Sequence, residues 1–81
     1  MEVPLAAGPR LETISAADPL VIDAGNDAVI LSASRPVTVR DTSGSTNLDA
    51  GKVSTFDGRI IVIAKDEALV YVRAARRFAV P

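Results

Sequence analysis

The sequence predicts a small all-β protein, either an antiparallel sandwich or a barrel-like meander, with extended N- and C-terminal arms. Short runs of Val, Ile and Thr alternate apolar and polar side chains, as strands with one buried face do. Gly, Asn, Asp and Ser separate these runs, and they are residues that turns prefer. No segment of useful length shows helical periodicity. The 81 residues are too few for two cores, so we expect one domain over 10–75, an arm over 1–9 and a tail over 76–81.

Seven segments carry the strand pattern, and turn-forming residues lie between them. Asp57-Gly58 is the strongest two-residue hairpin signal, and Gly25-Asn26-Asp27 and Lys65-Asp66-Glu67 also predict chain reversals. The polar run Ser43–Asn47 predicts a connecting loop. We therefore expect residues 35–73 to form a compact antiparallel meander. The predicted strands are 10–15, 20–23, 28–32, 37–40, 52–56, 59–64 and 68–73.

Two of these predicted strands, 59–64 and 68–73, are apolar on both faces. A half-exposed antiparallel strand is normally polar on one side, so each of these strands needs cover on both sides. Either the sheet folds over itself or another subunit covers the second face, and the two arrangements can coexist. The candidate oligomer-interface residues on these strands are Ile60, Ile61, Val62, Ile63, Leu69, Val70, Tyr71 and Val72.

Both ends of the chain are candidates for docking on a partner. Pro4 and Pro9 lack a backbone donor, which should keep residues 1–9 out of any strand ladder. Near the C-terminus, Arg73, Arg76 and Arg77 combine with Phe78, which suits either nucleic acid or an acidic protein surface. Three arginines are few for nucleic acid and the net charge is −1, so a protein partner is favoured. The partner-docking candidates are Val3, Pro4, Leu5, Arg73, Arg76, Arg77 and Phe78.

The composition removes several kinds of site and of stabilisation. The chain has no Cys and no His, which excludes disulfides, thiolate metal sites and the commonest general base. A domain this small normally gains stability from disulfides, metals or partner subunits, so partner subunits are the leading candidate. No apolar run approaches the ~20 residues that span a bilayer, and the acidic, proline-containing start does not suit a signal peptide. We expect synthesis in a cytoplasm-like environment, no membrane contact and no cofactor.

The sequence contains no close match to a calcium-binding loop or to a catalytic motif. Asp41–Asp49 places side-chain oxygens at alternate positions, as a calcium loop does, but its glycine falls at position four and Lys52 stands at position twelve. An EF-hand requires glycine at position six and glutamate at twelve, so a polar connector is the better interpretation, with calcium binding left open. No Gly-x-Ser-x-Gly, Ser-x-x-Lys or phosphate-binding glycine pattern occurs. We therefore expect a protein that is not an enzyme.

Residues 37–72, about half of the chain, contain a recognisable order of predicted strands and turns. Val37–Asp41 leads into an Asp-x-x-Gly turn, a Ser/Thr/Asn-rich loop follows at 44–47, and a strand at 52–56 precedes a Val- and Ile-rich hairpin at 59–72. This order of elements resembles a β module of bacteriophage structural proteins, which occurs in capsid decoration proteins, head fibres and tail appendages. The fibre versions usually carry more glycine and aromatic residues near their end than this chain does.

The resemblance implies a non-enzymatic capsid decoration (cement) protein that stabilises a phage head by binding between capsid subunits. It implies the major capsid protein or another virion protein as partner, and a symmetric homo-oligomer with a trimer favoured. Neither nucleic acid nor a membrane is an expected partner, and the expected location is the virion, assembled in the host cytoplasm. Two alternatives stay open: a tail, neck or head-fibre component, and a small ligand- or carbohydrate-binding β module. The binding module should be a monomer.

Overall fold

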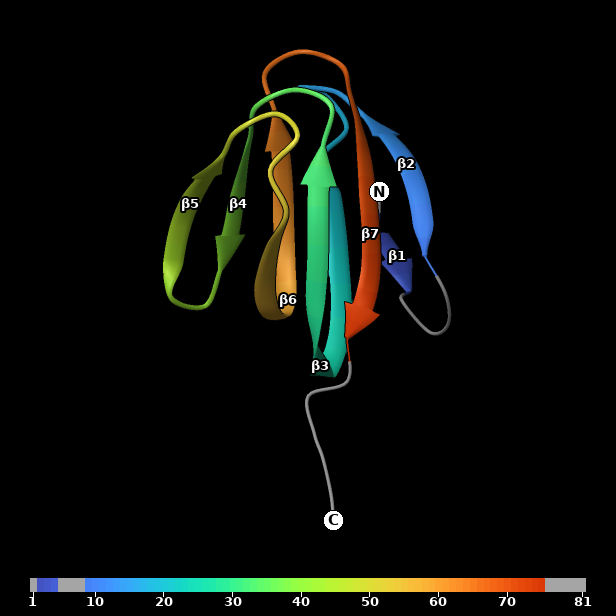
Figure 1. The fold of residues 1–81 in the computed structure, drawn as a ribbon, viewed down its shortest axis with the longest axis vertical. Helices are drawn as coiled ribbons and strands as arrows, with labels where there is room; N and C mark the ends of the chain where they lie inside the picture. The colour runs from blue at the N-terminus through green and yellow to red at the C-terminus, as the bar shows by residue number, and fades with distance from the viewer. Residues whose placement is uncertain (1, 5–8, 76–81) are drawn as a thin grey trace.

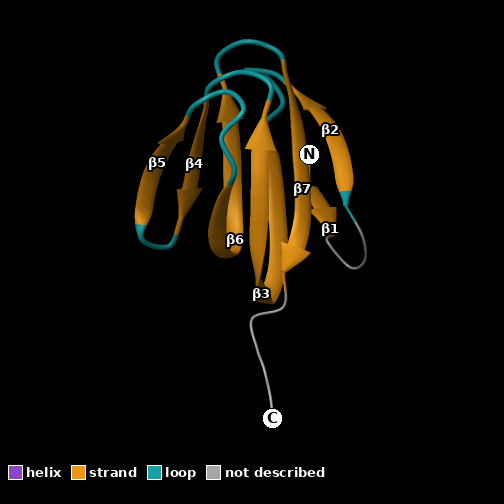
Figure 2. Cartoon of the chain, in the orientation of Figure 1, coloured by secondary structure: helices purple, strands orange, loops and turns teal. Residues whose placement is uncertain are grey.

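The computed structural model describes residues 2–4 and 9–75, and every regular element in them is a β-strand (Figure 1, Figure 2). The prediction of an all-β protein is confirmed. This part of the chain contains no helix that could cross a membrane. The strands are β1 (Glu2–Pro4), β2 (Arg10–Ile14), β3 (Leu20–Ala33), β4 (Val37–Asp41), β5 (Gly44–Leu48), β6 (Ser54–Ala64) and β7 (Ala68–Ala75).

The strands form one sheet in the order β2-β7-β3-β6-β4-β5, and β1 pairs with β3 beside this path. The β1–β3 pairing is parallel, whereas all the others are antiparallel. Among strands that follow each other in sequence, only β4 and β5 are paired. Within residues 35–73, the predicted pairing of each strand with the next in sequence is therefore wrong except for β4 and β5. The path ends at β2 and at β5, so the sheet is not closed into a barrel.

The long strands β3 and β6 bend together and fold the sheet over itself. Leu20–Asp23 pairs with Arg59–Val62, and Ala28–Leu31 pairs with Ser54–Asp57, with a register shift between the two ladders. In Figure 1 both ribbons turn back at the lower end of the view. The result is two facing halves. The β4–β5 half holds residues 2–4, 20–23, 37–41, 44–48 and 59–64, and the β2–β7 half holds 10–14, 28–33, 54–57 and 68–75.

Gly58 allows β6 to make this bend. Its φ is +35°, and a Cβ at this position would lie 2.9 Å from the carbonyl oxygen of Gly25 on β3. Only glycine fits where two backbones approach so closely at a positive φ. The predicted Asp57-Gly58 hairpin is thus wrong, since the segments on its two sides pair with β3 rather than with each other. Gly25-Asn26-Asp27 is likewise a bend within one strand, β3.

One hydrophobic core fills the space between the two halves. Along β3, β4, β6 and β7, alternate residues point inward and are buried, as the side-chain period of a strand requires, whereas β2 and β5 each bury one residue, Ile14 and Leu48. Lys65–Glu67 connects β6 in one half to β7 in the other. The apolar inner faces of the two halves pack against each other in this core. The core residues are Ile14, Leu20, Ile22, Val29, Leu31, Ala33, Val37, Val39, Leu48, Phe56, Ile60, Val62, Ala64, Ala68, Val70 and Val72.

The polar run Ser43–Asn47, predicted as a loop, lies almost entirely in β5. The Asp41 Oδ1 atom accepts hydrogen bonds from the backbone N–H groups of Ser43 (2.8 Å) and Gly44 (3.1 Å). This side-chain turn reverses the chain over two residues, and Gly44 follows it at a φ of +135°. The Asp-x-x-Gly motif is therefore the turn of the β4–β5 hairpin, and the Ser/Thr/Asn residues after it have strand geometry.

Three residues of the predicted N-terminal arm belong to the sheet. Glu2, Val3 and Pro4 pair with Val21, Ile22 and Asp23 of β3, which corrects the prediction that prolines keep residues 1–9 out of any ladder. Pro4 is the last residue of its strand, at the side of the sheet path, where a missing backbone donor is tolerated. The predicted tail, 76–81, lies outside the described residues.

We expect Gly58→Ala to destabilise the domain by about 2 kcal/mol or more. A positive φ is sterically unfavourable for alanine, and the added Cβ would also clash with the Gly25 carbonyl oxygen. In a domain of this size such a loss lowers the melting temperature by roughly 8 °C or more. Thermal unfolding followed by circular dichroism measures the change. Gly51→Ala is the matched control, because its φ is +78° but nothing lies within 4 Å of the added Cβ. Equal losses in the two variants would contradict the close approach at the bend.

Candidate interaction surfaces

The folded sheet divides the predicted oligomer-interface residues between the core and the surface. Four of the eight, which lie on the inner faces of β6 and β7, are 0% exposed: Ile60, Val62, Val70 and Val72. Their prediction as interface residues is wrong, because the opposite half of the same chain covers them. The other four point outward, with Ile61 and Ile63 half-buried and Leu69 and Tyr71 exposed.

An apolar patch lies on the outer side of the β2–β7 half. Leu11 of β2 pairs directly with Tyr71 of β7, and Leu69 is two residues away on the same face. Their exposed fractions are 64%, 39% and 46%. We call Leu11, Leu69 and Tyr71 the β2–β7 face. Leu11 was absent from the predicted residues, because the alternation in 10–15 is weak and only the pairing of β2 with β7 places it beside Tyr71.

The outer side of the β4–β5 half changes from apolar to polar across the strands. Ile61 of β6 pairs with Val21 of β3 on one side and with Arg40 of β4 on the other, and Arg40 pairs with Ser45 of β5. Val21 and Ile61 are half-buried, while Arg40 and Ser45 are exposed. This side offers less apolar surface than the β2–β7 face, and it ends in a fully polar strip on β5.

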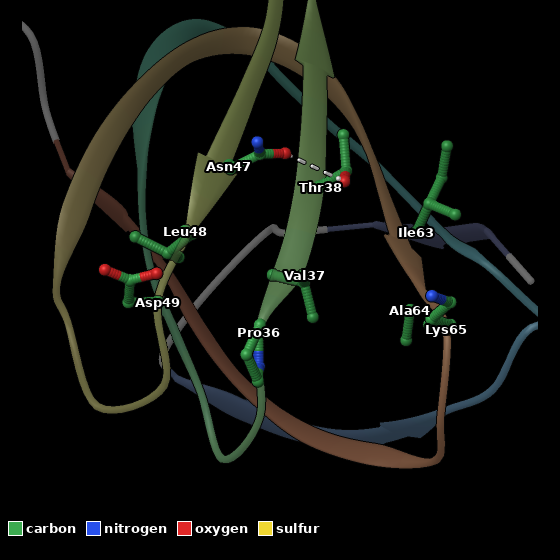
Figure 3. Close-up of a pocket in the computed structure, with 9 residues that line it drawn as sticks. All are labelled: Pro36, Val37, Thr38, Asn47, Leu48, Asp49, Ile63, Ala64 and Lys65. Atoms are coloured by element: carbon green, nitrogen blue, oxygen red, sulfur yellow. Dashed lines mark hydrogen bonds between the residues drawn. The ribbon is translucent and has the colours of Figure 1, made fainter.

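A surface pocket of about 480 Å³ opens where β4 begins and β5 and β6 end (Figure 3). The hydroxyl of Thr38 donates a hydrogen bond to the Asn47 Oδ1 atom at 3.2 Å. Asp49 and Lys65 are the charged residues among those that line it. The pocket combines apolar walls with few polar groups, which suits a small apolar group or side chain. Its lining is Pro36, Val37, Thr38, Asn47, Leu48, Asp49, Ile63, Ala64 and Lys65.

Most of the predicted partner-docking residues cannot be placed as side chains. Leu5, Arg76, Arg77 and Phe78 lie outside the described residues, and Val3 and Pro4 are described by their backbone pairing with β3. Arg73 is exposed on β7, where it pairs with Ile30 of β3. The docking role of these residues stays a prediction.

The structure does not gather the oxygen-bearing side chains of Asp41–Asp49 at one point. Asp41 is engaged by the backbone of its own turn, and Ser45, Thr46 and Asn47 alternate between the two faces of β5. Within residues 2–4 and 9–75, no group of three or more His, Cys, Asp or Glu side chains is placed to hold a metal ion.

No protein-family model, no curated protein sequence and no solved structure matches this chain. Function is therefore inferred from the chain's own surfaces. The β2–β7 face can bury apolar area against a partner, the pocket can hold a small group, and the edge of β5 can accept another strand.

We expect Val70→Asp to unfold the protein and the adjacent Leu69→Asp to leave it folded. Val70 has no exposed surface, so an unpaired carboxylate there costs several kcal/mol, a large part of the stability of a small domain. Leu69, its neighbour on the same strand, is 46% exposed and keeps the new carboxylate in water. Circular dichroism and thermal melts distinguish the outcomes. A folded Val70→Asp variant would contradict the assignment of this face to the core.

Proposed function

We propose that this chain is a non-enzymatic structural protein of a bacteriophage particle, a capsid decoration protein that binds between capsid subunits. The observation that carries the proposal is the β2–β7 face, where three large apolar side chains lie side by side at the surface. Contiguous apolar patches with polar surroundings mark interaction sites on small proteins. The resemblance of the sequence over 37–72 to phage structural modules supports the choice of a virion.

The β2–β7 face would work by burying apolar area against a capsid subunit or a second copy. Burying each of Leu11 and Leu69 stabilises a complex by about 1.5–3 kcal/mol at most. Tyr71 adds apolar area together with a hydroxyl that can hydrogen-bond at the rim, which is why tyrosine is enriched in interfaces. The adjacent Thr13 and Arg73 supply a polar border. Docking of the N-terminal arm and the arginine-containing tail on the same partner belongs to this proposal.

A second function is favoured by the pocket between Pro36 and Lys65. Its volume of about 480 Å³ falls within the range of small-molecule sites. A ligand- or carbohydrate-binding module would use this pocket and would not need the β2–β7 face. The two functions differ in oligomeric state, because a binding module is complete as a monomer.

We expect the isolated protein to associate through the β2–β7 face at high micromolar concentration, and Leu69→Asp to weaken association through that face at least ~tenfold, which corresponds to about 1.4 kcal/mol. The carboxylate would have to lose its water in the apolar contact. Multi-angle light scattering measures the change. Ala17→Asp is the matched control, because it adds the same charge at an exposed turn after β2. A parent protein that stays monomeric would contradict self-association through this face.

The particle itself provides the direct test. Phage particles purified from the source of this chain should contain it in a fixed ratio to the major capsid protein, as quantitative mass spectrometry of intact heads would show. Heads treated to remove the chain should lose stability to heat and regain it when the purified protein is added. Particles that lack the chain would contradict the proposal.

A further inference from the structure

The two strands at the ends of the sheet path differ in how they protect their free edges. β2 follows Pro9, and its Arg10 and Glu12 pair with Val72 and Val70, which point into the core. The Arg10 Nε atom lies 3.0 Å from the Glu12 Oε2 atom. Prolines and inward-pointing charges are features by which edge strands resist the addition of another strand. The free edge of β2 is therefore protected.

β5 carries none of these features. Gly44-Ser45-Thr46-Asn47-Leu48 has no charged residue and no proline, and its register with β4 runs without a bulge from Asp41↔Gly44 to Val37↔Leu48. All its residues except Leu48 are exposed. No strand in the described part of the chain pairs with its other side. β5 thus presents backbone N–H and C=O groups in regular strand geometry, ready to pair with another strand.

We propose that β5 pairs in antiparallel fashion with β5 of a second copy of this chain, about a twofold axis at Thr46. The two sheets then become one continuous sheet across the dimer. In this register Thr46 faces Thr46 of the second copy, Ser45 faces its Asn47, and Gly44 faces its Leu48. The inference concerns a different surface from the β2–β7 face and does not depend on a role in a phage particle.

The residues of β5 fit a copy of themselves. Thr46 meets another threonine, a favourable cross-strand pair, and Ser45 meets a small amide side chain. Leu48 keeps its side chain in its own core and faces a glycine, which adds no side chain to the contact. No charge is brought against a like charge. A twofold contact of this kind uses up the β5 edges of both copies, so it closes on itself as a dimer rather than extending into a filament.

The contact is small, and we expect the dimer to be weak. Stable interfaces usually bury more than ~1,200 Å², whereas this one joins two five-residue strands. A dissociation constant on the order of 100 µM is expected for the isolated protein. The contact gains strength wherever two copies are held close together, because the effective concentration then rises into the millimolar range.

The first test is sedimentation equilibrium of the full chain and of Thr46→Lys, from ~20 µM to ~1 mM, a range that brackets the expected dissociation constant. Lysine at an exposed edge position leaves the fold intact, but at the twofold axis it places two ammonium groups directly opposite each other. We expect Thr46→Lys to raise the dissociation constant at least ~tenfold. Ala17→Lys carries the same charge change at the other end of the sheet and should match the parent. Equal association of all three proteins would overturn the proposal.

The second test fixes the register by cysteine cross-linking, since the chain has no native cysteine. Directly opposite strand residues come close enough for a disulfide, so Thr46→Cys should oxidise to a covalent dimer. Ser45→Cys alone should cross-link poorly, whereas its mixture with Asn47→Cys should give a mixed dimer. Ala17→Cys measures the background from random collision. A Thr46→Cys yield no higher than this background would overturn pairing with a copy and leave the β5 edge to a strand of another protein.

Discussion

The close approach of Gly58 to the Gly25 backbone is the constraint on which the rest of this structure depends. The bend lets one β3–β6 ladder contribute to both halves of the sheet, and each half then covers the apolar inner face of the other. A flat ladder of the same strands would expose the inner faces of both halves to water. A conventional sandwich is built from two separate sheets. Here the bend at Gly25 and Gly58 lets a single sheet form both layers, in a domain of only 81 residues.

The same fold separates core from contact surface on single strands. Along β7, Val70 and Val72 complete the core while Leu69 and Tyr71 remain outside, next to Leu11 of β2. One apolar face of β7 is thus buried in the core, and the other is exposed to solvent. The open face supports the proposed assembly function, and the neutral edge of β5 offers a separate contact by main-chain hydrogen bonding. Side-chain burial and edge pairing are independent means of association, so the chain can use both.

Hydrophobic alternation located β2, β3, β4, β6 and β7, because it reflects only local geometry, but it missed β1 and β5. It did not predict which strands pair. Asp57-Gly58 signals a residue with positive φ, which a hairpin turn and a bend in a continuous strand both require, and the distinction depends on β3 lying opposite. The Ser43–Asn47 run looked like a loop because its side chains are polar on both faces, as suits an exposed edge strand. Leu11 was missed for a related reason, since its importance arises only from its partner, Tyr71.

The strand order also has a consequence for how the chain folds. Leu20 pairs with Val62 and Arg10 with Val72, so most ladders join residues that are far apart in sequence, and only the β4–β5 hairpin closes locally. Long loops must close before these contacts form, and proteins of this kind fold in milliseconds to seconds rather than microseconds. During that time the apolar strand β6 stays exposed until it pairs with β3 and β4. An early β4–β5 hairpin gives β6 a first edge on which to pair, which shortens the period in which its apolar residues are exposed to aggregation.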